Sequence, residues 1–196
     1  IHNVADLSEF RYRARERVRA GILVPRNLEP LYDISTSLRA FRAVKRHLAD
    51  ASLTIVGTGS DEARLKQEVA DEKIEDVVFT GRVERDAMPG LYDRADVFLT
   101  TSRIDNMPVS ILEAYYSGLP VVTTDAGGIP YMVEDEVSGL VRPMGDDQAL
   151  AAAIIRVLED GGLRSRLVRG GRDRASAYSW ARVGPEWMSV YERVRR

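Results

Sequence analysis

Residues 96–143 read DVFLTTSRIDNMPVSILEAYYSGLPVVTTDAGGIPYMVEDEVSGLVRP, and this stretch decides the fold. It opens with the apolar run 97–99, which is short enough to be a buried strand. A polar loop and a helix over 109–116 follow, and residues 120–124 are typical of the next strand. Strand, loop, helix and strand within about thirty residues predict a βαβ unit of a parallel sheet.

Two acids stand on either side of the start of this helix. Asp105 lies in the loop before it, and Glu113 lies in its second turn. Gly127-Gly128 read as a tight turn after the following strand, opening another helix. Ligands of parallel sheets bind beyond the carboxyl ends of the strands, so these residues are expected at the ligand-binding end. Taken alone, however, Asp105 and Glu113 would be an ordinary helix cap and an ordinary helix-face acid.

The order of the motifs points further. The set of Asp105, Glu113, Gly118-Leu119-Pro120 and Gly127-Gly128-Ile129-Pro130 resembles the C-terminal, donor-binding domain of the retaining glycosyltransferases of family 4. The resemblance extends from about residue 1 to the C-terminus, although the family has Glu where this chain has Asp105. It implies an α/β fold, a Rossmann-like doubly wound parallel sheet that forms one half of a GT-B architecture.

The resemblance also implies a function. Such a domain binds a nucleoside-diphosphate sugar, typically a UDP-sugar of polysaccharide biosynthesis. Together with an N-terminal acceptor domain it transfers the sugar with retention of configuration, with no metal ion and no cofactor besides the donor. The start at Ile1 suggests a fragment, which is expected to be inactive alone. The expected partners are the donor and the N-terminal domain, with peripheral membrane association through that domain.

Roles of individual residues follow from the resemblance. Glu113 would bind the ribose hydroxyls, and Asp105 would hold the hydroxyls of the donor sugar. The amides at Asn106 and Met107 would meet the distal phosphate, helped by the helix dipole. The remaining implied contacts are those of Gly127 and Gly128, which clear room around sugar and diphosphate, and of Gly81, Arg82 and Val83, which lie against the base.

The loop after the first strand carries the main departure from the family. Arg26 matches the arginine that neutralises the donor diphosphate, and it is the second predicted catalytic residue beside Asp105. Leu31 stands where the family has a lysine. Cations that stabilise the negative charge developing on the diphosphate are a main source of catalysis, so the loss of the lysine should affect the reaction. Arg103 precedes Asp105 in the facing loop, so it could supply the positive charge of the missing lysine, or it could be a solvated surface residue.

Composition bounds the remaining possibilities. The chain has 196 residues, a net charge of −2 and no cysteine. These values exclude disulfides, zinc–thiolate sites and a cysteine nucleophile, and they give nucleic-acid binding no electrostatic support. No apolar run is long enough to span a bilayer and no signal peptide is present, so a cytoplasmic protein is expected.

The rest of the chain divides into three parts. Residues 1–20 are expected to be an interdomain connector, its segment 11–20 solvated and either helical or irregular. Residues 21–176 form the predicted donor-binding domain, in which Gly161-Gly162 end a helix and Gly57-x-Gly59 is favoured as a structural turn. Residues 177–196 predict a terminal helix, broken or kinked at Pro185, that packs on the N-terminal domain.

Two alternatives stay open. The first is a nucleotide-binding module that has lost its chemistry, which Leu31 and Asp105 both favour. The second is a GT-B sugar-nucleotide epimerase, which would need its own acids and histidines. Only His2 and His47 exist and neither lies in a predicted active loop, so the epimerase ranks last.

Overall fold

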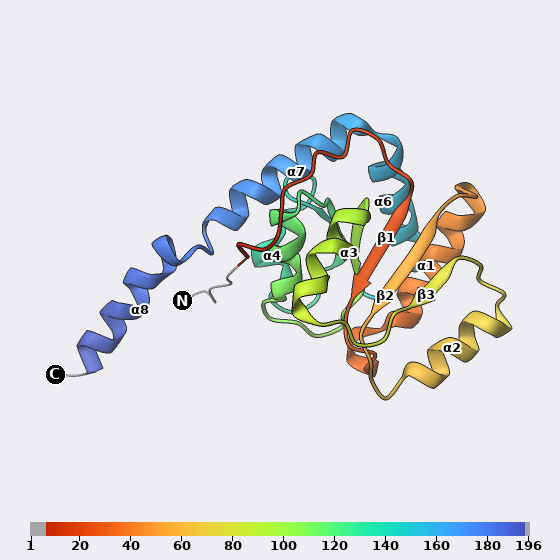
Figure 1. Cartoon of the computed structure of the whole chain (residues 1–196), viewed down its shortest axis with the longest axis horizontal. Helices are drawn as coiled ribbons and strands as arrows, with labels where there is room; N and C mark the ends of the chain where they lie inside the picture. The colour runs from red at the N-terminus through yellow and green to blue at the C-terminus, as the bar shows by residue number, and fades with distance from the viewer. Residues whose placement is uncertain (1–6, 195–196) are drawn as a thin grey trace.

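The computed structural model describes residues 7–194 and contains a six-stranded sheet in the order β3-β2-β1-β4-β5-β6. Strands β3, β2 and β1 are labelled side by side in Figure 1. All five strand pairs are parallel. The order reverses between β1 and β4, which confirms the predicted doubly wound, Rossmann-like α/β fold. The strands are β1 (Gly21–Pro25), β2 (Ser52–Val56), β3 (Val77–Phe79), β4 (Val97–Thr100), β5 (Val121–Thr124) and β6 (Leu140–Arg142).

Helices cover both faces of the sheet. Side chains of α1, α2 and α6 share one buried apolar cluster, and those of α3, α4 and α5 are packed in or against a second. Helix α7 contributes to both. The helices are α1 (Ile34–His47), α2 (Glu62–Asp71), α3 (Met88–Arg94), α4 (Val109–Tyr116), α5 (Ile129–Met132), α6 (Asp147–Glu159), α7 (Gly161–Ser176) and α8 (Trp180–Val194), with short 3-10 turns η1 (Pro30–Tyr32) and η2 (Arg85–Ala87).

The central strands form because their side chains can be buried on one face or the other. In β1, Ile22 and Val24 join the first cluster and Leu23 joins the second. In β4, Val97 and Leu99 are divided from Phe98 in the same way. This period of two explains why short, wholly apolar runs become central strands here.

The connector differs from expectation in one respect. Described from residue 7 onward, it is irregular, one of the two predicted forms, and segment 11–20 is mostly exposed as predicted, with the exception of Arg15. Arg15 is only 6% exposed and its guanidinium donates to the backbone carbonyls of Tyr92, Ala95 and Ser117. The connector is therefore bound to the domain that it precedes. Residues 1–6 and the end of the predicted C-terminal segment, 195–196, lie outside the described residues.

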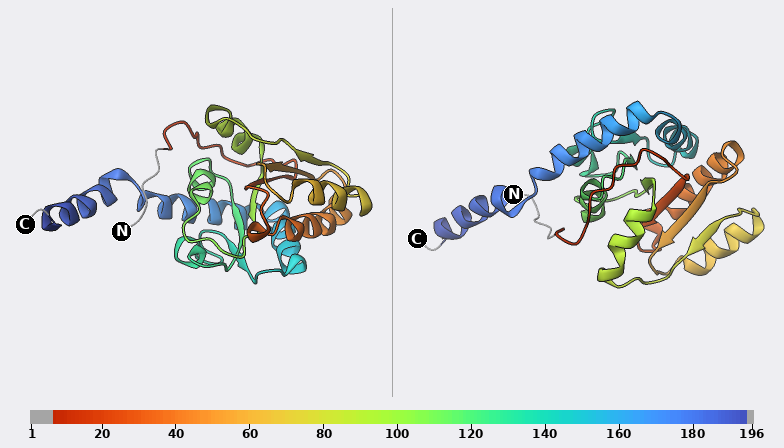
Figure 2. Two further views of the ribbon diagram at one scale, coloured as in Figure 1. Left: turned by 90° about the horizontal axis from the view of Figure 1, so that it is seen from below. Right: turned by 45° about the horizontal axis from the view of Figure 1, so that its top comes forward.

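The C-terminal helices correct two expectations. Gly161-Gly162 do not end α6, because Asp160 ends it and at the same time begins α7 by accepting a hydrogen bond from the Leu163 amide at 2.8 Å. Pro185 does not break α8, which runs continuously past it. Helix α8 projects away from the α/β body (Figures 1 and 2). No helix within residues 7–194 is long and apolar enough to cross a membrane.

Candidate functional site

A cleft of about 470 Å³ opens at the carboxyl ends of the strands, where the strand order reverses. Loops that follow β1, β2 and β3 line it together with α3 and α4. Doubly wound sheets bind their ligands at this point because loops on the two sides of the reversal separate there. The lining residues are Pro25, Arg26, Asn27, Tyr32, Val56, Gly57, Thr58, Arg82, Val83, Met88 and Glu113.

Arg26 is the less exposed of the two arginines that line this cleft, the other being Arg82. The Arg26 amide donates to the Val56 carbonyl at 2.9 Å, which extends the β1–β2 ladder by one residue and fixes where the side chain begins. The guanidinium is largely buried and forms an ion pair with Asp105. Its carbon also lies 4.6 Å from the centre of the Tyr32 ring, a cation–π contact. Burial lowers the pKa of Arg26, against the influence of the neighbouring tyrosines and Glu113.

Two nitrogens of the Arg26 guanidinium, Nε and Nη2, are buried and have no hydrogen-bond partner among residues 7–194. Nη2 faces Asp105 in the ion pair, whereas Nε has no such partner. Buried N–H groups in native proteins are nearly always satisfied, so an unpaired one in a cleft wall suits an anionic ligand.

Leu31, at the family's lysine position, and its neighbour Tyr32 differ in whether they line the cleft. Leu31 is 42% exposed and does not line the cleft, whereas Tyr32 does. Both belong to η1, whose tight turn directs neighbouring side chains differently. The apolar substitution at the family's lysine position therefore lies on the surface. Tyr32, which the sequence did not single out, is in its place at the cleft.

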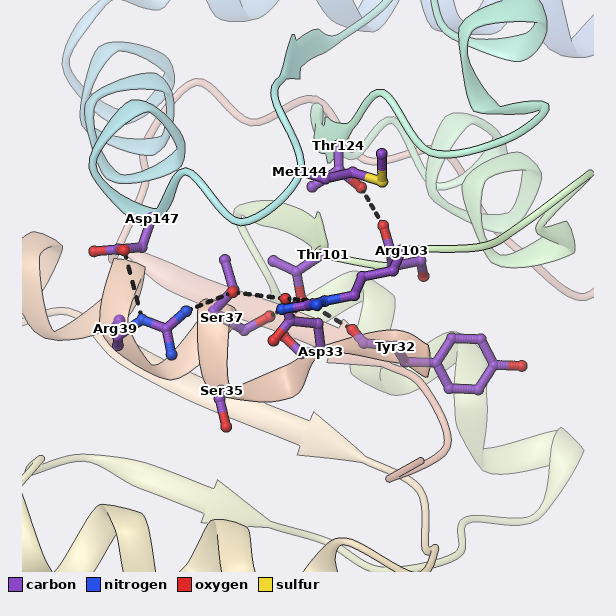
Figure 3. Close-up of polar contacts among 12 residues, drawn as sticks. Tyr32, Asp33, Ser35, Ser37, Arg39, Thr101, Arg103, Thr124, Met144 and Asp147 are labelled. Atoms are coloured by element: carbon purple, nitrogen blue, oxygen red, sulfur yellow. Dashed lines mark hydrogen bonds and ion pairs between the residues drawn. The ribbon is translucent and has the colours of Figure 1, made fainter. Parts of the chain in front are cut away.

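Arg103 is engaged elsewhere (Figure 3). Its Nε donates to Asp33 Oδ2 at 2.9 Å and its amide donates to the Leu31 carbonyl at 2.9 Å. Thr101 Oγ1 donates to the Asp33 carbonyl at 2.9 Å, so the loop after β4 is tied to the start of α1. The Arg103 side chain is 62% exposed and is not part of the cleft lining. These contacts favour the interpretation of Arg103 as a surface residue over the interpretation that it replaces the family's lysine.

Glu113 is the acid of the cleft. It lies in the second turn of α4, and its Oε2 accepts a hydrogen bond of 2.5 Å from the hydroxyl of Tyr92. Burial raises the pKa of Glu113, while the Tyr92 hydrogen bond, Arg85 and Arg26 act in the opposite direction. Tyr92 is fully buried, and burial together with Glu113 raises the pKa of its hydroxyl. Tyr92 is thus the donor in this pair.

Asp105 and Asn106 lie on a loop that rests on the glycine pair. The Gly128 amide donates to the Asp105 carbonyl at 2.7 Å. A Cβ atom at Gly127 would lie 2.3 Å from the Asp105 carbonyl oxygen, and one at Gly128 would lie 2.0 Å from that of Asn106. The two glycines are therefore needed for backbone-to-backbone packing. Their predicted contact with a ligand, like those of Asp105, Asn106 and Met107, stays a prediction.

The predicted base-binding segment is partly in place. Arg82 and Val83 line the cleft, and Gly81 adopts a φ of +69° with open space around its Cα. The Gly81 carbonyl accepts from the Gly57 amide at 3.0 Å, which joins the loops after β3 and β2. Gly57 and Gly59 themselves pack against the backbone of residues 26–28, which favours the structural-turn interpretation, although Gly57 also lines the cleft.

The structure thus brings four predicted residues into one cleft wall, namely Arg26, Arg82, Val83 and Glu113, with Asp105 joined to them through its ion pair. It does not place Gly81, Asn106, Met107, Gly127 or Gly128 in that lining. Sequence reasoning missed Tyr32 and Tyr92. A usable signal was the choice of Tyr over Phe at a buried position, because a buried hydroxyl needs a partner.

Within residues 7–194 no three His, Asp or Glu side chains gather closely enough to hold a metal ion. His47 lies at the C-terminal end of α1 and pairs with Glu159 of α6 at 2.8 Å, away from the cleft. His2 lies outside the described residues.

Solved structures share the fold. Anabaena Alr3699/HepE in complex with UDP-glucose superposes with a TM-score of 0.87 at 21% identity, over 98% of this chain and 56% of that one. The C-terminal domain of a glycosyl transferase group 1 family protein (LpcC) from Francisella tularensis gives a TM-score of 0.79 at 19% identity, over 89% of this chain and 98% of that one. At such identities the likeness shows the fold, one Rossmann-like half as found in GT-B glycosyltransferases.

Curated relatives are more similar in sequence. The amylovoran biosynthesis glycosyltransferase AmsK of Erwinia amylovora is 37% identical over 131 residues, 63% of this chain and 32% of that protein. The phosphatidyl-myo-inositol mannosyltransferase of Mycobacterium leprae is 32% identical over 167 residues, 85% of this chain and 44% of that protein. The chain thus spans less than half the length of these relatives. The family model "Glycosyl transferases group 1" matches residues 13–174. The chain belongs to this glycosyltransferase family.

Proposed function

We propose that this chain is the donor-binding half of a retaining, family 4 glycosyltransferase. It binds a nucleoside-diphosphate sugar in the cleft and, with an N-terminal acceptor domain, transfers the sugar with retention and without a metal ion. The observation that carries the proposal is a cleft at the strand-order reversal whose wall holds both a partly buried cation, Arg26, and a partly buried acid, Glu113.

Charge complementarity suggests which part of the donor each group meets. The carboxylate of Glu113 accepts hydrogen bonds from the ribose hydroxyls. Arg26, with its unpaired Nε, binds the diphosphate and stabilises the negative charge that develops on it as the bond to the sugar breaks. Asp105 holds the hydroxyls of the donor sugar once its ion pair with Arg26 has opened.

Backbone groups complete the proposed site. The base lies against Gly81, Arg82 and Val83, where the absence of a side chain at Gly81 admits a planar ring. The amides at Asn106 and Met107, close to the start of α4, meet the distal phosphate. Gly127 and Gly128, which pack against the carbonyls of Asp105 and Asn106, clear room around the sugar and the diphosphate.

The whole protein is proposed to contain an acceptor domain N-terminal to this chain. The connector and α8 would contact that domain, and membrane association, if present, would come from it. The names of relatives and neighbours mention both GDP-mannose and UDP as donors or ligands, so both bases are candidates. A cytoplasmic location is consistent with a nucleotide-sugar donor.

Calorimetric titration tests the proposal. UDP and GDP are titrated into this chain, with uridine and guanosine as phosphate-free controls. We expect saturable binding of one diphosphate, much weaker binding of its nucleoside, and no sugar transfer by the isolated chain. Absence of binding by both diphosphates would overturn the proposal.

One alternative retains support. The ion pair between Arg26 and Asp105 neutralises the proposed catalytic cation, as in a nucleotide-binding module without chemistry. Turnover by the full-length protein separates the two. A module of this kind would bind nucleotide but neither transfer the sugar nor hydrolyse the donor.

A further inference from the structure

The connector clamps α4, the helix that carries Glu113, to its neighbour α3, the helix that carries Tyr92. Arg15 Nη2 donates to the Tyr92 carbonyl at 2.7 Å and Nε donates to the Ala95 carbonyl at 2.9 Å, both at the end of α3. Nη1 donates to the Ser117 carbonyl, at the end of α4, at 2.5 Å. Burial lowers the pKa of Arg15 to about 10, so the clamp is charged at neutral pH. One guanidinium thus fixes α3 relative to α4.

Tyr92 connects this clamp to the cleft. Its ring packs against Phe10 of the connector, edge to face at 5.3 Å, and against Phe98 of β4, stacked at 6.4 Å. A side chain held on two sides has little freedom to move. Its hydroxyl donates a hydrogen bond to Glu113 Oε2, and this bond holds the carboxylate in one orientation.

We infer that Tyr92 is a positioning residue for Glu113, and that Arg15 holds Tyr92 in place for this task. Tyr92 does not line the cleft and Glu113 does, so the tyrosine acts on a ligand only through the acid. This inference rests on the proposed function, because it assigns a role to Tyr92 in nucleotide binding by Glu113.

Two physical effects make the hydroxyl useful. First, it binds one carboxylate oxygen, which fixes the rotamer and leaves Oε1 for the ligand, so less conformational entropy is lost on binding. Second, it helps to keep the carboxylate ionised. Burial favours the protonated acid, and the groups that oppose this are Tyr92 on α3, Arg85 on η2 and Arg26 after β1. A protonated Glu113 would accept fewer hydrogen bonds from the ribose.

The test is Tyr92→Phe, which removes only the hydroxyl. We expect nucleoside-diphosphate affinity to fall about tenfold at neutral pH, the scale for a lost hydrogen bond to a charged group. We also expect the loss of affinity on acidification to begin at a higher pH than in the unmodified chain. A role in packing alone would not move this pH profile.

Two further variants complete the design. Tyr115→Phe is the matched control, since Tyr115 is also buried, lies on the same helix α4 as Glu113, and donates instead to Ser138 Oγ at 3.2 Å. It should bind nucleotide as the unmodified chain does, even if it is less stable. Tyr92→Phe combined with Glu113→Gln should bind no more weakly than Glu113→Gln alone, because the hydroxyl acts through the acid.

The outcomes separate the inference from its basis. If the unmodified chain binds no nucleoside diphosphate, the proposed function fails. If it binds and Tyr92→Phe has the same affinity and pH profile, the positioning role is wrong. Should Tyr92→Phe fail to fold, as judged by thermal unfolding, Arg15→Lys gives the same readouts, because lysine cannot reach all three carbonyls. An unchanged profile in that variant would equally overturn the inference.

Discussion

Arg26 and Asp105 form an ion pair at the cleft, so the cation proposed for the diphosphate and the acid proposed for the sugar neutralise each other in the absence of a donor. Both side chains are largely buried. Under the proposed function, a bound donor would separate them, with its diphosphate beside Arg26 and its sugar hydroxyls beside Asp105. Binding energy from the base and ribose is available for this separation.

The first prediction follows from that pair. Asp105→Asn removes the charge and keeps the size, so Arg26 no longer has an anionic partner. We expect free nucleoside diphosphate to bind up to about tenfold more tightly, while sugar transfer by the full-length protein falls. Calorimetry with the diphosphate and with the phosphate-free nucleoside checks this, since only the diphosphate should gain. Equal affinity for the diphosphate in both proteins would mean that the pair does not limit binding.

The second prediction concerns the cation itself. In the full-length protein, Arg26→Ala should lower turnover by about a hundredfold or more, the scale for one preorganised charge-stabilising donor. Arg103→Ala is the matched control, because that arginine lies outside the cleft lining and pairs with Asp33. Catalytic efficiencies of both variants decide the matter. Comparable losses of catalytic efficiency in the two variants would mean that Arg103 also stabilises the charge on the diphosphate.

The third prediction separates Tyr32 from its neighbour. Tyr32→Leu removes the ring that stacks on Arg26 and should weaken diphosphate binding about three- to fivefold. Leu31→Lys, at the family's lysine position, should leave affinity equal or raise it slightly, because this side chain is exposed and outside the lining. A large gain from Leu31→Lys would show that this position reaches the diphosphate after all.

The fourth prediction links function to stability at Glu113. Burial raises the pKa of this acid, so the folded chain holds its proton more tightly than the unfolded chain does. Between the ordinary glutamate pKa and the raised value, the free energy of unfolding therefore falls as pH rises. Glu113→Gln removes this fall, and at neutral pH the variant should be at least as stable as the parent.

The same variant should bind nucleoside diphosphate about ten- to a hundredfold more weakly, equivalent to roughly 1.5–3 kcal/mol. In the unmodified chain, affinity should fall on acidification as Glu113 is protonated. Thermal unfolding and titration over a series of pH values measure both effects. A variant with unchanged affinity would make Glu113 a structural helix acid.

The fifth prediction tests the glycine pair. Gly128→Ala places a Cβ 2.0 Å from the Asn106 carbonyl oxygen and should destabilise the fold by about 1–3 kcal/mol, as overpacking does. Gly90→Ala, inside α3, meets only the end of the Arg94 side chain at 3.5 Å and should be neutral or stabilising. Denaturant unfolding compares them. Equal stability of both variants would show that the loop at 105–106 can move away at no cost.

The central strands could be predicted from sequence because their pattern is local. The apolar runs around Leu23, Ile55 and Phe98 are short, rich in branched or aromatic side chains, and bounded by polar turns. Nothing beyond each run is needed to assign it to a strand. The start of α6 is local in the same way, because Asp146 precedes the helix and accepts a hydrogen bond from the Ala149 amide.

The connector could not be predicted in the same way. Residues 11–20 are rich in arginine, and such a run is normally solvated. Arg15 is buried because three backbone carbonyls, from the ends of two helices far along the chain, converge on it. No local pattern carries that information, since it depends on where α3 and α4 end in space.

The candidate site shows the same division. Glu113 and Arg26 were found because their neighbours in sequence form ordered motifs. Tyr32 and Leu31 are adjacent, and only the geometry of η1 decides which of them lines the cleft. Likewise, the glycines at 127–128 were expected beside a ligand, whereas the structure shows that they first of all admit the backbone of the neighbouring loop.

Asp160 has a consequence for how this chain can vary in length. It ends α6 and begins α7, so no spare residue lies between the two helices. Each residue inserted there would turn α7 by about 100° around its own axis. Arg164, whose Nε donates to the Arg15 carbonyl at 3.0 Å, would then swing away from the connector, and α8 would leave in another direction. A single-residue insertion at this joint should therefore be tolerated far less well than one in an exposed loop.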